Sequence, residues 1–435
     1  MKKIFFILLS IICESVDTQA QKKFESLEEL LTFADTKSIT LKSNNIRLLQ
    51  AKKTLLASKL AIADPLANIN SSFTDNTRLP INLFPAEIFG GQKGDFREIQ
   101  TGVQYNTNST QNLDIKLLNL EGWQTFKLAE INIQISENEV KVTQKNLHEN
   151  IASAYYNIVQ LYAQMESIKQ NLMVSDTLLA LVERKYKEGI VKLQDMNDAR
   201  VNQLTIKESI NQIAFLLKQN NLTLKILSDI PESENIEILE RINPIPITSN
   251  PMILSNNLLV ESNRLKELSA LTTIQKTNRA FAPTISFVAS NSFNQYNNDL
   301  TLLGGKWITS NYVGLKLNFA LPNANTLTNK FKAQYDYQLA QKNTEQAQIK
   351  ADLTVLQLEM DWGKALSQTK NYSEIIDIQR DTFNKNKNLY NEGLISIDRV
   401  LSSFNTLTNA IYSLNSSKVS ISLAQAKIDI NNKIK

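Results

Sequence analysis

The chain carries the stretch Tyr-Lys-Glu-Gly-Ile at residues 186–190 and a second copy, Tyr-Asn-Glu-Gly-Leu, at residues 390–394. Each copy interrupts a long segment without proline, residues 120–230 in the first half and residues 323–435 in the second. Because proline breaks helix interiors, such segments indicate long helices. A glycine after a helix can adopt the left-handed conformation that reverses the chain. We therefore predict two helical hairpins, each turning at the glycine of its repeated stretch.

The apolar spacing within these segments is that of a coiled coil. Between Leu147 and Leu172 apolar residues recur at steps of four and three, and the same steps run from Ile206 to Leu227. A seven-residue period of this kind predicts helices packed side by side with left-handed supercoiling. At about 1.5 Å per residue, a helix over residues 323–388 would be roughly 100 Å long. We expect long coiled-coil arms rather than a compact bundle of short helices.

Short segments with a two-residue period lie between the helical ones. Apolar residues alternate with polar ones or glycine at 312–319, and similar alternation occurs at 284–289, 103–105 and 113–117. Strands that are apolar on one face fit the wall of an outer-membrane barrel, although they also fit the edge of a soluble sheet. Four strands per chain are too few to enclose a water-filled lumen, so several copies would have to contribute.

The two halves share one order of elements. A proline marks the passage from a helix to a strand in each half, at Pro65 and at Pro283. Each half then reads helix, strand, loop, strand, long helix, tight turn, helix, which indicates an internal repeat. We predict a first repeat over 21–230, a proline-rich connector over 231–250 and a second repeat over 251–435.

The first twenty residues are typical of a secretory signal peptide. Two lysines precede an apolar run over residues 4–12, and Thr-Gln-Ala at 18–20 fits a cleavage site. Cleavage after Ala20 would remove Cys13, the only cysteine. Lipidation of Cys13 is the alternative, but the preceding Ile12 is larger than the residue that lipoprotein processing requires.

Composition argues against several classes of function. The formal charge of +4 comes from 47 basic and 43 acidic residues without a basic stripe, so no nucleic-acid partner is expected. With Cys13 removed, the mature chain has one histidine, His148, and no thiol. We therefore predict no metal site, no cofactor and no Cys or His catalysis. No nucleophile constellation, carboxylate pair or phosphate-binding loop is recognisable, and we expect that the protein is not an enzyme.

These features together resemble the TolC family of outer-membrane efflux proteins. The resemblance rests on the turns at 186–190 and 390–394, on Pro65 and Pro283, and on Phe-Pro-Ala-Glu-Ile-Phe-Gly-Gly at 84–91. It covers essentially the whole mature chain. It implies a mainly α protein with membrane β, in which coiled-coil hairpins form an α-barrel. Four strands from each protomer of a homotrimer would close a shared twelve-stranded β-barrel.

The resemblance also implies a function and partners. The chain would be the passive outer-membrane channel of a tripartite efflux or type I secretion system, surrounded by outer-membrane lipid and extended by helices into the periplasm. Its tips, formed by Gly189, Ile190, Gly393 and Leu394, would contact a periplasmic adaptor (membrane fusion) protein linked to an inner-membrane transporter. A periplasmic coiled-coil scaffold or adaptor without a membrane span is the alternative function.

The family pattern further implies a periplasmic gate near these tips. Asp195 and Tyr390 match the positions of a pair that keeps family channels closed, with Asp198, Asp398 and Arg399 nearby. Arg399 stands where the best-known members carry an acidic residue, so an acidic ring and cation preference are not expected. The competing interpretation is that these are solvated surface charges, and that Asp195 interacts only with its own helix dipole.

Overall fold

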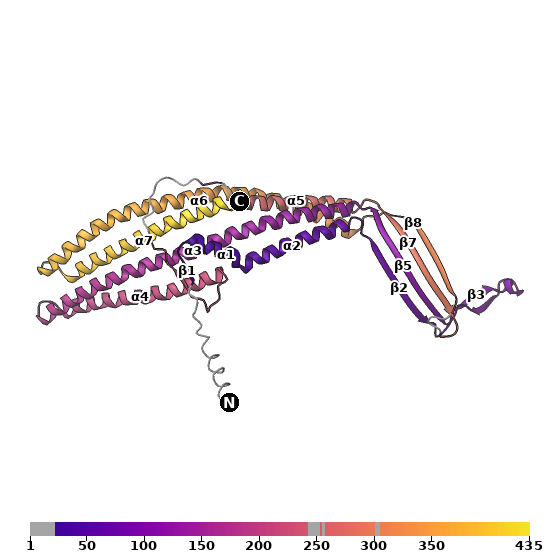
Figure 1. Ribbon diagram of the computed structural model, residues 1–435, viewed down its shortest axis with the longest axis horizontal. Coiled ribbons are helices and arrows are strands. Elements are labelled where there is room, and N and C mark those ends of the chain that lie inside the picture. The colour runs from indigo at the N-terminus through magenta and orange to yellow at the C-terminus, as the bar shows by residue number, and fades with distance from the viewer. Residues whose placement is uncertain (1–21, 242–252, 255–256, 301–304) are drawn as a thin grey trace, which may run out of the picture. The chain divides into compact units, whose positions relative to one another are not determined.

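The computed structural model describes residues 22–241, 253–254, 257–300 and 305–435 (Figure 1). The predicted signal peptide with Cys13 and residues 242–250 of the predicted connector lie outside these ranges. The chain divides into two compact units. The helical unit contains Met1–Arg47, Glu137–Ser262 and Glu345–Lys435, and the sheet unit contains Leu48–Ser136 and Asn263–Thr344. Each unit thus draws on both predicted repeats.

Two helical hairpins dominate the helical unit, as the repeated turns predicted. The first pairs the end of α3 (Leu120–Lys187) with α4 (Leu193–Leu227), and the second pairs the end of α6 (Ala324–Asn391) with α7 (Ile397–Lys433) (Figure 1). All four helices contribute to one apolar core, in which Ile168, Ile206 and Phe404 are buried. The predicted coiled-coil spacing is confirmed at this core, because apolar residues at steps of three and four face one side of a helix.

No helix of the described residues is both long enough and apolar enough to cross a membrane.

A second core in the helical unit holds the first described elements, β1 and α1, against the long helices. Strand β1 (Lys22–Phe24) pairs in parallel with β6 (Ile236–Ile238), and α1 (Leu27–Lys37) follows β1 directly. Ser26 caps α1 by accepting a hydrogen bond from Glu29 N. Leu30 of α1 is fully buried against Tyr155 and Ile158 of α3. The sequence pattern had predicted neither β1 nor β6, because three-residue strands are too short to establish a period.

The sheet unit is built around one four-stranded antiparallel sheet. Its order is β2 (Leu66–Asp75), β5 (Tyr105–Leu118), β7 (Thr284–Asn297) and β8 (Trp307–Asn318), which lie side by side (Figure 1). The predicted number of four strands is confirmed, but the alternating segments at 103–105 and 113–117 both fall at β5, and β2 is the strand that follows Pro65. The central pair, β5 and β7, joins the two halves of the chain. Among the described residues β2 and β8 each have a neighbour on one side only.

Four helical segments of the sheet unit connect to these strands. Parts of α2 (Ile39–Leu60) and α5 (Leu258–Arg279) precede β2 and β7, and the starts of α3 and α6 follow β5 and β8. Pro65 and Pro283 stand immediately before β2 and β7. The predicted passage from helix to strand at each proline is therefore confirmed, as expected for a residue that cannot continue a helix.

The long connection between β2 and β5 forms a second, smaller β-structure. β3 (Ile81–Pro85) and β4 (Phe96–Gln100) pair as an antiparallel ribbon, with the 3-10 turn η1 (Ala86–Phe89) between them. Sequence analysis predicted a loop here. The glycines at 90, 91 and 94 are exposed at the end of the ribbon. The two prolines that bound β3 hid its alternating pattern, because proline normally argues against a strand.

Candidate functional site

The repeated stretch of the first half forms the turn between α3 and α4. Gly189 N donates to Tyr186 O at 2.9 Å, and Ile190 N donates to Lys185 O at 2.9 Å. This pair of bonds ends a helix with a glycine in the left-handed conformation, and Gly189 has φ +74°. The predicted role of Gly189 in reversing the chain is confirmed.

The second copy repeats this turn between α6 and α7. Gly393 N donates to Tyr390 O at 3.1 Å, Leu394 N donates to Leu389 O at 2.9 Å, and Gly393 has φ +77°. Ile190 and Leu394 follow the two glycines, and both side chains are exposed. Two equivalent tips therefore each present an apolar side chain to solvent.

The side chain of Asp195 caps α4. Its Oδ2 accepts a hydrogen bond from Lys192 N at 2.9 Å, which satisfies one of the free N–H groups at the start of the helix. This contact agrees with the helix-dipole interpretation of Asp195. The carboxylate also affects the second hairpin. Burial is the larger cause that raises the pKa of Tyr390, and the negative charge of Asp195 raises this pKa further.

Tyr390 lies inside the interface between the two hairpins. Only 3% of the residue is exposed, and it packs in the core shared by all four helices. Its hydroxyl is buried and has no hydrogen-bond partner among the described residues. A buried hydroxyl without a partner is unfavourable, so this group is a candidate for a contact made elsewhere in the assembled protein.

Lys185 joins the two tips, and sequence analysis missed it. Its Nζ donates to Tyr390 O at 2.7 Å and to Asn391 O at 3.3 Å, and it lies 4.3 Å from the centroid of the Tyr390 ring. A cation at the carbonyl end of α6 also interacts favourably with the helix dipole. The sequence feature that could have identified Lys185 is its position four residues before Gly189, near the predicted turn.

The other predicted gate residues join none of these contacts. Asp398 and Arg399 are exposed in the first turn of α7, and Asp198 is half-buried in α4. Within the described part of the chain, none of the three side chains forms a hydrogen bond or an ion pair. The structure thus brings Asp195, Tyr390 and Lys185 together at the tips and leaves the other three as surface charges of the protomer.

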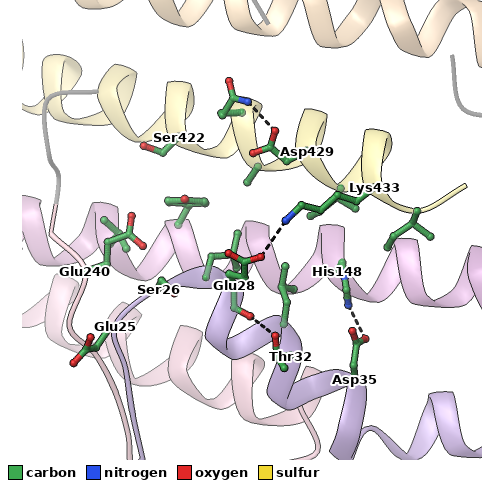
Figure 2. A pocket seen from close by; sticks show the side chains of 18 of the residues that line it. Glu25, Ser26, Glu28, Thr32, Asp35, His148, Glu240, Ser422, Asp429 and Lys433 are labelled. Atoms are coloured by element: carbon green, nitrogen blue, oxygen red, sulfur yellow. Dashed lines mark hydrogen bonds and ion pairs between the residues drawn. The ribbon is translucent and has the colours of Figure 1, made fainter. Parts of the chain in front are cut away.

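A cavity of about 710 Å³ lies elsewhere in the helical unit, between α1, α3, α7 and residues 240–241. Figure 2 shows that several of its polar side chains are bonded to other residues that line the cavity. His148 Nε2 lies 2.7 Å from Asp35 Oδ1, and Lys433 Nζ lies 3.1 Å from Glu28 Oε1. These contacts fasten α1 to α3 and α7. No group of three His, Cys, Asp or Glu side chains in the described ranges could hold a metal ion.

The four-stranded sheet has two different faces. On one face, Asn112 Nδ2 donates to Asn68 Oδ1 at 3.1 Å, and Ser290 Oγ donates to Asn112 Oδ1 at 2.8 Å. The opposite face carries exposed apolar side chains, among them Ile69 of β2 and Val313 of β8. A polar face that is hydrogen-bonded to itself, with an apolar face behind it, is typical of a membrane barrel wall.

The fold and the site define a class of protein, namely a duplicated helical-hairpin protein with a membrane-type sheet. A model of the family described as outer membrane efflux protein matches residues 89–228 and 251–431. The match spans most of the chain, and the chain belongs to the family of outer membrane efflux proteins. It is therefore an outer-membrane channel protein of efflux systems, and the alternative prediction of a periplasmic scaffold without a membrane span is wrong.

Solved structures agree with this fold. The outer membrane protein VceC from Vibrio cholerae is 16% identical with a TM-score of 0.68, and the match covers 93% of this chain and 95% of that one. The Campylobacter jejuni CmeC outer membrane channel is 17% identical, with a TM-score of 0.65 and coverages of 93% and 85%. The Neisseria gonorrhoeae MtrE outer membrane channel is 14% identical, with a TM-score of 0.63 and coverages of 96% and 93%. No curated protein matches the chain significantly.

Proposed function

We propose that three copies of this chain form one outer-membrane channel, which passively conducts substrates from a periplasmic adaptor and an inner-membrane transporter to the exterior. The observation that carries the proposal is the sheet β2-β5-β7-β8, whose two outer strands each have a neighbour on one side only among the described residues. Unpaired backbone groups in lipid cost several kcal/mol each, so such edges require partners. Four strands from each of three copies make a closed twelve-stranded barrel.

The surface of α6 supports the same assembly. Four large apolar side chains of the helical unit are exposed at steps of four and three residues, namely Ile349, Leu353, Leu356 and Met360. A stripe with this spacing fits the seam of a helix that packs against another helix. Because the stripe is not covered within the protomer, a helix of a neighbouring copy is its natural partner.

The tips are the proposed contact surface for the adaptor. Gly189 and Gly393 shape two equivalent turns, and Ile190 and Leu394 expose an apolar side chain at each. A hairpin end with one apolar side chain beside polar neighbours suits a small, specific protein contact. The adaptor would thus engage two similar sites on every copy of the chain.

The proposed gate lies just behind the tips. Asp195 and Tyr390 are its central residues, and Asp198, Asp398 and Arg399 flank them. The proposal is supported by the charge of Asp195, which acts on Tyr390, and by the unpartnered hydroxyl of Tyr390. Asp195→Ala is expected to loosen the periplasmic end and to raise single-channel conductance in planar bilayers. Unchanged conductance in both Asp195→Ala and Tyr390→Phe would remove these two residues from the gate.

One experiment tests the assembly. The mature protein is extracted in detergent, its mass is measured by light scattering, and its conductance is recorded in planar bilayers. We expect a mass of three copies and discrete single-channel currents. Leu356→Glu should disrupt the trimer because it places a charge in the exposed stripe, whereas Gln357→Glu at the neighbouring exposed position should not. A stable single copy without channel activity would contradict the proposal.

A further inference from the structure

The ribbon formed by β3 and β4 is firmly attached to the sheet. At its base, Asn76 N donates to Gln104 O at 2.7 Å, and Thr101 N donates to Pro80 O at 3.1 Å. These bonds continue the pairing of β2 with β5 into the ribbon. The ribbon therefore has a defined orientation relative to the sheet, and its two faces differ in how far they are covered.

One face of the ribbon, the covered face, is partly shielded by the ribbon's own turn. Phe84 and Arg97 lie opposite each other on this face. The ring of Phe89, from η1, packs edge-on against Phe84 with centroids 6.4 Å apart, and the Arg97 guanidinium lies 5.7 Å from the centroid of the same ring. Phe84 is consequently half-buried.

The other face is bare. Ile81, Leu83 and Pro85 of β3 lie on it, together with Phe96 of β4, because side chains alternate between the faces of a strand. Leu83 is 62% exposed and Phe96 is 65% exposed. A two-stranded ribbon is at best marginally stable in water by itself, so an uncovered apolar face of this kind favours a partner.

Lipid is a poor partner for this face. Glu98 lies directly opposite Leu83, in the middle of the apolar side chains. Within the described residues its carboxylate makes no hydrogen bond or ion pair. A carboxylate placed in hydrocarbon without a partner is costly, whereas a protein surface can offer it a donor. The six charged residues from Arg78 to Glu98 are three basic and three acidic, so the ribbon has no net positive charge to attract anionic headgroups.

The position of the ribbon indicates which protein surface is available. The ribbon extends from the end of β2, which is an outer strand of the sheet. In the proposed trimer this edge meets β8 of a neighbouring copy, so the bare face emerges beside the seam between copies. We propose that the bare face, formed by Ile81, Leu83, Pro85 and Phe96, packs against the neighbouring copy of this chain and stabilises the junction between the two copies at this end of the barrel. This inference rests on the proposed trimeric channel.

Site-directed photocrosslinking tests the inference. Cys13 is the only cysteine, so a Cys13→Ser background allows a single cysteine to be placed at will. Leu83→Cys on the bare face and Asn82→Cys on the covered face are labelled with benzophenone maleimide, and the full-length protein is illuminated after reconstitution into phospholipid vesicles. The two positions are adjacent in β3 but point to opposite faces, which makes them matched probes.

We expect Leu83→Cys to give a covalent dimer on a denaturing gel, with a yield several-fold above that of Asn82→Cys. Lipid adducts, an equal yield from both positions, or no adduct in a protein that is still trimeric by light scattering would each overturn the inference and leave the proposed channel intact. Failure of the unlabelled parent protein to form trimers would instead overturn the proposed function, and the inference with it. As a label-free check, Phe96→Ser should lower the temperature at which the trimer dissociates relative to Gln92→Ser at the end of the ribbon.

Discussion

Lys185 of the first hairpin donates a hydrogen bond of 2.7 Å to the backbone carbonyl of Tyr390 in the second, and its ammonium group lies over the ring of the same residue. The two residues are 205 positions apart in sequence. The contact combines a charged hydrogen bond, a cation–π interaction and a favourable charge at the end of α6. It is a direct polar link between the two repeated tips.

Removing this link should loosen the second tip. Lys185→Met keeps the aliphatic stem but loses the charge, and we expect the local stability of residues 388–394 to fall by roughly 1–2 kcal/mol, the scale of a partly exposed charged hydrogen bond. Hydrogen exchange of these amides measures the change. Lys187→Met, at the exposed end of α3, is the matched control. Equal protection in both variants would show that the contact contributes nothing.

The hydroxyl of Tyr390 should affect the stability of the folded state more at high pH than at neutral pH. Burial and Asp195 raise the pKa of Tyr390, so above the ordinary tyrosine pKa of 10.0 the unfolded chain loses this proton before the folded one does. The folded state is then destabilised as pH rises above about 10. Tyr390→Phe should leave stability at pH 7 nearly unchanged, because the hydroxyl has no partner in the protomer.

The pH dependence of stability is measured as the melting temperature between about pH 8 and pH 11, a range that brackets the ordinary tyrosine pKa of about 10. The variant should lose stability less steeply than the parent. Tyr412→Phe is a useful comparison, since burial also raises the pKa of Tyr412 in the same core. If the parent and Tyr390→Phe follow the same slope, Tyr390 is not the group responsible.

Replacing either tip glycine should strain its turn. Gly189 and Gly393 have φ of +74° and +77°, and no atom lies within 4 Å of an added Cβ at either position. Gly393→Ala should therefore cost about 1 kcal/mol from backbone conformation alone, without a steric clash. Chemical denaturation measures this loss. Gly363→Ala inside α6 should be neutral or stabilising, because alanine favours a helix and space is open there as well.

The contact between Asp35 and His148 beside the cavity should stabilise the packing of α1. Asp35→Ala leaves the buried ring of His148 without its partner, and we expect the free energy of unfolding to fall by roughly 1–3 kcal/mol. Asp398→Ala, an exposed acidic residue of α7, should change it by about 0.5 kcal/mol or less. Limited proteolysis near α1 locates the effect, and equal protease resistance in both variants would contradict it.

Local features of the sequence were sufficient to predict most of the fold. The steps of three and four residues around Ile158 and Ile206 predicted the buried side of each long helix, and the repeated glycines predicted both turns. Pro65 and Pro283 located the start of two strands. These signals are local, because helix periodicity, proline and left-handed glycine act through the residues next to them in the chain.

Contacts between distant segments required the tertiary structure. Nothing in the spacing of Lys185 or Tyr390 indicated that they meet, and the alternation in β3 was hidden by its flanking prolines. Asp195 could be assigned to a helix start from sequence, but its effect on Tyr390 depends on how the hairpins pack. The sequence by itself determined the elements and their buried faces, since these follow from local periodicity, whereas the pairing of charges and the bare face of the ribbon were decided by packing in three dimensions.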